Sequence, residues 1–299
     1  MPRERLRALL AGLASGRRAA ADDPFTDWDS IAKLEGMLAI EAAFGIQLPD
    51  EALGGVRTFE ELAALVERAC ADRPATPPAG GTPAWLTPPL PPAPVARWGR
   101  PCSGLLTAWM RLWFRLRVTG REHLMASGPC LLCANHSSHL DGPALLAAAG
   151  PARDRVVFAA AKDYFFTRPR LAAWSARALP MIPWERGGDL AAMRENLRHL
   201  AACRAAGRIV VFFPEGGRSR DGTLQPFKEG LAFFAEQLGL PVVPAWIGGT
   251  HRALPKGASF PRPGRLTVAF GPPVQWAGEG AALGATVRRR MLALGETAP

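Results

Sequence analysis

The stretch PCLLCANHSSHLDGPALL, residues 129–146, contains the three parts of one structural unit. An apolar, strand-like run, Cys130–Ala134, comes first, and the polar loop NHSSHLD follows it. From Asp141 onward the sequence is typical of a helix start, with an acidic residue and a proline in the first turn of an apolar segment. A strand that leads through a loop into a helix is the repeating unit of α/β domains.

Apolar runs of the same kind alternate with helical patterns further along the chain. The other strand candidates are Arg155–Ala160, Met181–Pro183, Arg208–Phe213, Val242–Ile247 and Leu266–Phe270. Between the second and third of these, apolar residues recur at helical spacing: Leu190, Met193, Leu197, Leu200 and Cys203. This alternation predicts an α/β domain with a mixed, mostly buried sheet flanked by helices. Functional loops would lie at the strand ends.

A different, helical pattern covers the N-terminal residues 3–70. The apolar residues of the three predicted helices are Leu6, Leu9, Leu10 and Leu13, then Ile31, Leu34, Leu38 and Ile40 after a start at Asp29–Ser30, then Leu62, Leu65 and Val66 within Phe59–Ala69. They predict a small all-α bundle of three or four helices over residues 1–72. Nine prolines lie between residues 71 and 100, so we expect a semi-rigid linker at 73–101 and a second domain at 102–299.

The net charge of +10 is unevenly distributed between these regions. Residues 22–75 carry 12 acidic and 4 basic side chains, whereas residues 76–299 carry 27 basic and 13 acidic ones. A basic domain suits anionic substrates or anionic lipid surfaces. We do not expect a nucleic-acid partner, because no reader motif is present and the single Tyr and scattered Phe form no stacking platform.

The segment Leu105–Leu116 is apolar and aromatic but interrupted by arginines. Trp109, Trp113 and Phe114 could enter the acyl boundary of a membrane while Arg111 and Arg115 stay at headgroup level. A helix that simply packs on the following domain fits the same pattern, and both interpretations stay open.

Cysteine usage and hydropathy indicate the compartment. The five cysteines form no disulfide framework, and Cys130 and Cys133 would point to opposite faces of a strand, so we expect neither a zinc site nor disulfides. This suits a reducing compartment. No signal peptide and no apolar run of about 18 residues is recognisable. We therefore predict a peripheral protein on the cytoplasmic side of the cell membrane, without a transmembrane helix.

The loop NHSSHLD places His136 five residues before Asp141. A histidine can take a proton from a hydroxyl at neutral pH, and a carboxylate on the other ring nitrogen would orient it. His139 lies between them and is interpreted as a loop residue.

A second polar motif, FPEGGRS, follows another apolar run at residues 213–219. Glu215, Gly216 and Arg218 form a cationic glycine turn in which backbone N–H groups and a guanidinium could meet an anion, although a solvated salt bridge in a tight turn is common. Arg186 in IPWER and Lys228 in FKEG add further cations in turns.

In order, NHSSHLD, IPWER, FPEGGRS with FKEG, and VVPAWIGGT at 242–250 resemble the four-block pattern of the glycerolipid acyltransferases, most of all the 1-acylglycerol-3-phosphate acyltransferases. The resemblance covers about residues 115–275. It implies that His136 is the general base and Asp141 its partner. The implied binding residues for the acceptor's phosphate are Lys162, Arg186, Glu215, Gly216, Arg218 and Lys228.

Two departures from the family pattern concern the acceptor. Gly217 replaces the threonine of E-G-T-R, and Pro180, Pro183 and Trp184 precede Arg186 where glycine and apolar residues are usual. The implied reaction moves a fatty acyl group from a thioester, acyl-CoA or an acyl carrier protein, to the hydroxyl of a lysophospholipid in phospholipid biosynthesis. The resemblance implies no metal.

The segment DSIAKLEGMLAIEAAFGIQLPDE, Asp29–Glu51, resembles the helix of an acyl carrier protein that begins at the phosphopantetheine site. By this resemblance Ser30 carries 4'-phosphopantetheine, attached by a phosphopantetheinyl transferase. Alternatively, Ser30 is only an N-cap in a carrier-like fold kept for docking.

Two other functions remain as alternatives. The first is a non-catalytic, membrane-attached acyl carrier or docking protein. The second is a metal-dependent hydrolase with His136, His139 and Asp141 as ligands, for which the sequence offers no further ligand set.

Overall fold

A computed structural model describes residues 2–14, 30–49, 56, 58–72, 99–165, 179–186, 190–228, 230–275 and 280–297. The chain forms two compact units, one of Met1–Pro89 with Glu185–Arg198 and one of Leu90–Trp184 with His199–Pro299. The domain boundaries expected from the sequence stay predictions, and residues 73–98 of the predicted linker lie outside the described residues.

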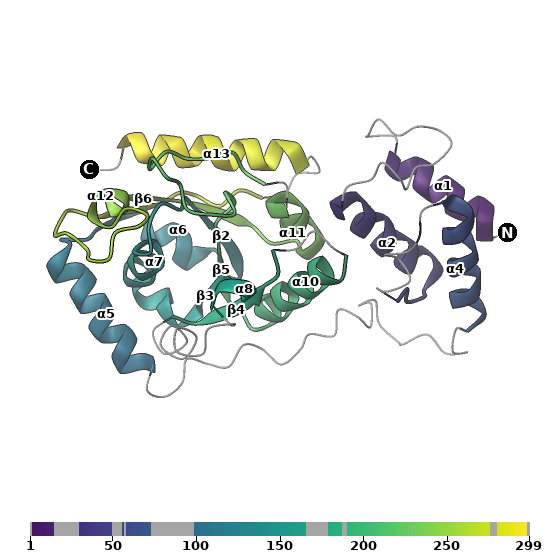
Figure 1. Cartoon of the computed structure of the whole chain (residues 1–299), viewed down its shortest axis with the longest axis horizontal. Coiled ribbons are helices and arrows are strands. Elements are labelled where there is room, and N and C mark those ends of the chain that lie inside the picture. Colours follow the sequence, from purple (N-terminus) through teal and green to yellow (C-terminus); the bar gives the residue numbers. More distant parts are fainter. Residues whose placement is uncertain are drawn as a thin grey trace. The chain divides into compact units, whose positions relative to one another are not determined.

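The first unit contains three described N-terminal helices, α1 (Pro2–Ala14), α2 (Ser30–Phe44) and α4 (Phe59–Ala71) (Figure 1). Helix α1 contacts both of the others. Their fully buried side chains include Leu6, Leu10, Leu34, Leu62 and Val66, which all belong to the predicted apolar stripes. The amphipathic pattern therefore identified the core of this unit.

Helices α1, α2 and α4 lie at the three helical segments that the sequence predicted, and the residues described between α2 and α4 are not helical. Gly45 adopts a positive φ of 62° and ends α2, and residues 46–49 follow without regular structure. Only glycine adopts this conformation without a steric cost. Helix α2 begins at Ser30, but Asp29 and the Ser30 side chain lie outside the described residues.

The second unit is built on one seven-stranded sheet in the order β1-β7-β6-β2-β5-β3-β4. The strands are β1 (Arg117–Thr119), β2 (Cys130–Ala134), β3 (Val156–Ala161), β4 (Met181–Trp184), β5 (Ile209–Phe212), β6 (Val242–Gly248) and β7 (Thr267–Phe270). All neighbouring strands are parallel except β6 and β7, so the sheet is mixed.

Helices cover both faces of this sheet. They are α5 (Gly99–Trp113), α6 (Arg121–Ala126), α7 (Asp141–Ala149), η2 (Gly150–Arg155), α8 (Lys162–Phe165), α10 (Leu190–Ala205), α11 (Gly230–Leu238), α12 (Thr250–Ala253) and α13 (Gly280–Thr297), with the division between the units falling inside α10. Cys130 and Leu132 of β2 join the core cluster that contains α5 and α7, whereas the Cys133 thiol contacts Met291 of α13. Since side chains alternate along a strand, α13 covers the opposite face (Figure 1).

The six predicted strands are confirmed to within one residue at each end. Strand β1 was missed because its three residues, RVT, carry no apolar run. The predicted helix Leu105–Leu116 was displaced: α5 begins at Gly99 and ends at Trp113, after which Arg115 adopts a φ of 46° and turns the chain into β1.

The direction of the strands decides where the two polar motifs meet. Strand β2 runs parallel to both of its neighbours, β5 and β6. The carboxyl ends of parallel strands lie at the same edge of a sheet, where α/β folds place their ligands. The loops that follow β2, β5 and β6 therefore come together.

Candidate functional site

His136 and Asp141 are in direct contact in the loop that follows β2. The distance from Nδ1 of His136 to Oδ2 of Asp141 is 2.8 Å. The Asp141 side chain is fully buried, whereas 21% of the His136 side chain is exposed. An ionised carboxylate only accepts hydrogen bonds, so Nδ1 carries the proton and Nε2 is the basic nitrogen. The arrangement can hold an imidazole ready to accept a proton.

The loop is shaped around the Asp141 carboxylate. Oδ2 also accepts hydrogen bonds from the backbone N–H groups of Ser137 and Ser138, at 2.7 and 2.8 Å. Asp141 is the first residue of α7, where the partial positive charge of the helix N-terminus stabilises a carboxylate. The spacing of five residues thus follows from a loop that wraps back onto the helix start.

Asn135 ties this loop to the neighbouring strand, a role that the sequence analysis did not assign. Its amide donates to the carbonyl of Ile247 at 2.9 Å and accepts from the N–H of Ile247 at 2.7 Å. The Asn135 side chain thus bonds to the backbone of β6 just beyond the last residue of β2, next to the paired region of the two strands. The sequence signal for this role is an asparagine placed directly after a strand-like apolar run.

Glu215 connects the second motif to the first. Its Oε1 accepts from the backbone N–H of His136 at 2.6 Å, and its Oε2 accepts from that of Gln225 at 2.9 Å. The N–H of Ser219 donates to the carbonyl of His136 at 2.7 Å. Burial raises the pKa of the Glu215 carboxyl, although both backbone donors act in the opposite direction. Both carboxylate oxygens are thus engaged in holding the loops together.

Phe213 lies against the imidazole and was not singled out from the sequence. The two rings are stacked, with centroids 4.1 Å apart and an interplanar angle of 17°. Phe213 directly follows β5, which neighbours the strand before His136. One face of the imidazole is therefore covered.

The turn after Glu215 brings Gly216 and Lys228 together. Gly216 has a φ of 70°, and a Cβ built there would lie 2.6 Å from Cε of Lys228. The N–H of Lys228 donates to the carbonyl of Pro214 at 2.9 Å, which closes the loop. A Cβ at Gly217 would meet nothing within 4 Å, so the turn has room for the threonine of the family pattern.

Arg218 and His139 lie close enough for their charges to interact. Desolvation lowers the pKa of His139, and the positive charges of Arg218 and His136 lower it further. Arg218 therefore places a cation near His139, in the loop that follows β2.

Lys162 and Arg186, the two remaining predicted binding residues, lie after other strands of the sheet. Both are exposed; Lys162 begins α8 directly after β3, and Arg186 follows β4 by two residues. Because β3 and β4 run parallel to β5, their carboxyl ends lie at the edge of the sheet where the two polar motifs follow β2 and β5. Arg186 is assigned to the first unit, so its role remains a prediction from the sequence.

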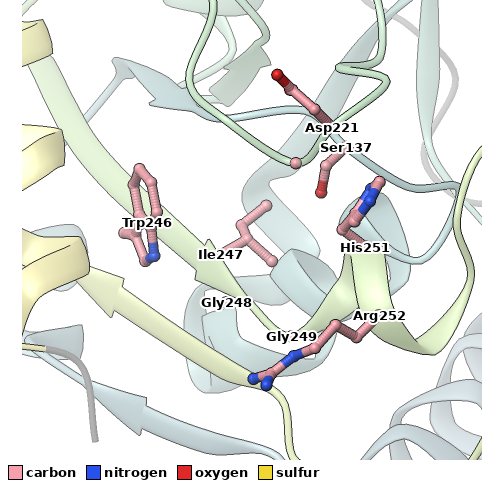
Figure 2. A pocket seen from close by; sticks show the side chains of 9 residues that line it. Ser137, Asp221, Trp246, Ile247, Gly248, Gly249, His251 and Arg252 are labelled. Atoms are coloured by element: carbon pink, nitrogen blue, oxygen red, sulfur yellow. The ribbon is translucent and has the colours of Figure 1, made fainter.

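A pocket of about 210 Å³ is lined in part by Ser137, the residue that follows His136. Figure 2 shows Ser137, Asp221 and His251 on one side of it and Trp246 on the other, with Arg252 at its border. Ser137 links the pocket to the site, because its N–H donates to Asp141 and its Oγ lies 3.2 Å from Oγ1 of Thr250. A group bound in this pocket would therefore be adjacent to the loop that carries His136 and Asp141.

The described residues contain no group of three His, Cys, Asp or Glu side chains that could hold a metal ion. The thiols of Cys130 and Cys133 lie on opposite faces of β2, as expected, and burial raises the pKa of Cys130 to about 12. Among the helices that the structure describes, none combines the length and apolar character that crossing a bilayer requires.

Comparison with known proteins matches the same region. The family model named Acyltransferase matches residues 115–248, which contain both polar motifs. The 1-acyl-sn-glycerol-3-phosphate acyltransferase alpha of Mus musculus is 30% identical over 196 residues, covering 64% of this chain and 67% of the relative. The chain belongs to the acyltransferase family.

Other members of the acyltransferase family show similar matches. The chloroplastic 1-acyl-sn-glycerol-3-phosphate acyltransferase BAT2 of Brassica napus is 33% identical over 147 residues, 49% of this chain and 41% of the relative. The crystal structure of the 1-acyl-sn-glycerophosphate (LPA) acyltransferase PlsC from Thermotoga maritima aligns with a TM-score of 0.53 and 25% identity, covering 65% of this chain and 77% of that chain. The chain thus shares with that structure the mixed sheet flanked by helices. It spans about half the length of the first relatives that it matches.

Proposed function

We propose that this acyltransferase moves a fatty acyl group from a thioester to the hydroxyl of a lysophospholipid, with 1-acylglycerol-3-phosphate as the acceptor. The observation that carries the proposal is the bond of His136 to the buried Asp141, at the edge of the sheet where the family motifs meet. Relatives named 1-acyl-sn-glycerol-3-phosphate acyltransferase support the acceptor and a place in phospholipid synthesis.

In the proposed mechanism, Nε2 of His136 takes the proton of the acceptor hydroxyl. The hydroxyl oxygen attacks the thioester carbonyl, and the thiol leaves with a proton returned by the imidazolium. Asp141 stabilises the imidazolium through Nδ1, and backbone N–H groups stabilise the oxyanion. No step requires a metal.

The acceptor's phosphate would be bound by the cations around the glycine turn, Arg218 and Lys228, with Lys162 and Arg186 as further candidates. We assign Glu215 a positioning role instead, because its two oxygens bond to the backbone of His136 and Gln225 and a carboxylate repels phosphate. Gly216 allows Lys228 to cross the turn.

The direct test compares the wild type with His136→Ala and Asp141→Asn in acyl transfer from acyl-CoA to 1-acylglycerol-3-phosphate. General acid–base catalysis contributes about 10²–10⁴ in rate, so we expect His136→Ala to lose about that factor in kcat. Asp141→Asn should lose a similar factor while the fold persists. Undiminished transfer by His136→Ala would exclude His136 as the general base. Absence of transfer by the wild type would support the non-catalytic carrier instead, and loss of wild-type activity with a chelator would support the hydrolase.

For the acyl donor we propose that Ser30 carries 4'-phosphopantetheine, so that the N-terminal unit presents the acyl group. The supporting observations are the carrier-like sequence from Asp29 and its acidic balance. A tethered donor has an effective concentration in the mM range if the linker spans the gap. Acyl-CoA and a free carrier protein are the other donors.

Co-expression with a phosphopantetheinyl transferase tests the donor proposal. The intact mass should increase by one phosphopantetheine, and Ser30→Ala should abolish the increase. An unchanged wild-type mass under conditions that modify a known carrier protein would overturn it, without affecting the test of His136.

We also propose that the protein binds peripherally to membranes through α5. Its proposed lipid substrates are located in the membrane. Four apolar side chains of this helix are exposed: Leu105, Trp109, Leu112 and Trp113. The cytoplasmic face remains a prediction from cysteine usage.

A further inference from the structure

The exposed side chains of α5 form one apolar face. Leu105, Trp109, Leu112 and Trp113 follow the spacing i, i+4, i+7 and i+8, which places them on one side of a helix. Leu105 and Leu112 are 73% and 82% exposed. On the other side, Met110 and, directly after the helix, Phe114 are fully buried in the core cluster, and the Trp109 ring packs edge-on against Phe114. Helix α5 therefore has one face in the domain and a second apolar face in solvent.

A further exposed hydrophobic side chain, outside α5, comes from a different part of the sequence. Phe260 lies in segment 255–265, which connects α12 to β7, and is 85% exposed. This is the largest exposure among the large hydrophobic side chains of the described residues.

Backbone hydrogen bonds join the base of this segment to the end of α5. The N–H of Leu266 donates to the carbonyl of Phe114 at 3.0 Å, and the N–H of Arg117 donates to the carbonyl of Leu266 at 2.9 Å. In Figure 1 the connection between α12 and β7 accordingly lies beside the C-terminal end of α5. The two apolar features thus share one end of this unit.

Both segments are basic and free of acidic residues. Residues 99–119 and 255–266 contain no Asp or Glu. Their exposed cations include Arg111, Arg115, Lys256, Arg262 and Arg265. Apolar side chains flanked by cations fit the acyl boundary and headgroups of an anionic bilayer.

We propose that segment 255–265 is a second membrane contact, with Phe260 entering the acyl boundary and Lys256, Arg262 and Arg265 meeting anionic headgroups. This inference rests on the proposed peripheral attachment through α5. A helix alone leaves the protein free to roll about the helix axis, whereas a second contact beside its end restricts that rotation. The segment would therefore set the orientation of the domain on the membrane.

The test measures cosedimentation of the full chain with vesicles of phosphatidylglycerol and phosphatidylethanolamine, and with zwitterionic phosphatidylcholine vesicles. Burying a phenylalanine side chain corresponds to about tenfold or more in affinity, so Phe260→Ala should bind anionic vesicles about tenfold more weakly. The matched control is Leu292→Ala on α13, another exposed apolar side chain, which should bind like the wild type. Replacing Lys256, Arg262 and Arg265 by Gln should weaken binding to the anionic vesicles only.

Wild-type binding by Phe260→Ala would overturn the inference, even if Leu112→Ser loses binding and the attachment through α5 stands. Self-association of the wild type without vesicles that Phe260→Ala abolishes would also overturn it, in favour of a second copy. The acyl-transfer assay tests the proposed function independently of vesicle binding. A wild type that binds vesicles but transfers no acyl group would contradict only the function.

Discussion

At the scale of single residues, Glu215 is a carboxylate within a basic motif that positions the backbone of two loops. It accepts one backbone N–H from each of two loops that are far apart in the chain. Because one of these belongs to His136, the position of the imidazole depends on a residue from the other motif.

We predict that Glu215→Gln loses activity and about 1–3 kcal/mol of stability. A glutamine has one acceptor oxygen, so one of the two N–H groups would face an amide NH₂ and lose its partner. The measurements are kcat and the unfolding free energy in urea. Gln225→Ala is the control, because it keeps the backbone N–H that Glu215 binds. Equal stability of the two variants would contradict the assignment.

Adjacent glycines provide a second comparison at this scale. Gly216→Ala introduces a Cβ at a φ of 70° and 2.6 Å from the Lys228 side chain, so we expect destabilisation of more than about 1 kcal/mol. Gly217→Ala meets open space and should stabilise the protein by about 0.4–1 kcal/mol through the unfolded state. Urea unfolding of both variants is the measurement, and the same effect at both positions would refute it.

At the scale of elements, Asp221 organises the segment that follows FPEGGRS. Oδ1 of Asp221 accepts hydrogen bonds from the Thr223 N–H, the Ser219 hydroxyl and the Thr223 hydroxyl. These bonds, that of the Thr223 N–H above all, lower the pKa of Asp221 to about 2. The segment that borders the pocket is thus held by one ionised side chain.

The lowered pKa predicts a pH dependence with a definite sign. The folded state favours ionised Asp221, so the stabilisation is present above the ordinary carboxyl pKa of 3.8 and is lost as the pH falls toward 2. Asp221→Asn should therefore be less stable than the wild type at pH 6. The difference should narrow between about pH 4 and the lowest pH at which both variants fold. Thermal unfolding across this range is the measurement, and a constant difference would disprove the prediction.

The strands show which secondary structure elements a local sequence pattern can predict. The six strands that the apolar runs predicted are present, because a strand buried on both faces must be apolar throughout. Strand β1 has no such run and exists because Arg117–Thr119 pairs with Thr267–Ala269, about 150 residues later in the chain. Its formation depends on β7.

At the scale of the whole molecule, a buried ion pair belongs to the first unit. Nη2 of Arg194 lies 2.8 Å from Oε1 of Glu41, and both side chains are at least 95% buried. The same Oε1 accepts from the N–H of Leu48 at 2.7 Å. This unit thus includes residues 185–198 as well as the N-terminal helices, which the sequence analysis did not anticipate.

We predict that Arg194→Ala destabilises this unit by about 3–5 kcal/mol, because it leaves Glu41 charged and buried. Arg198→Ala is the matched control on the same helix. Its ion pair with Glu195 is solvent-exposed and contributes at most about 1 kcal/mol. Hydrogen exchange of α2 amides in the full chain is the measurement. Similar protection in both variants would show that the pair does not hold the unit.

The sequence by itself determined the helical N-terminal module, six of the seven strands, and the position of both polar motifs after strands. Apolar periodicity and turn residues are local, so neighbouring residues are enough to specify them. It also placed the imidazole and the carboxylate of His136 and Asp141 in one short loop.

Only the tertiary structure decided the strand order, the bonds from Asn135 to Ile247 and from Glu215 to His136, and the stacking of Phe213 on the imidazole. These contacts join residues about 80 to 110 positions apart. They arise because parallel pairing of β2 with β5 and β6 brings three loops to one edge of the sheet. No local pattern encodes that pairing, since any buried apolar strand can pair with any other.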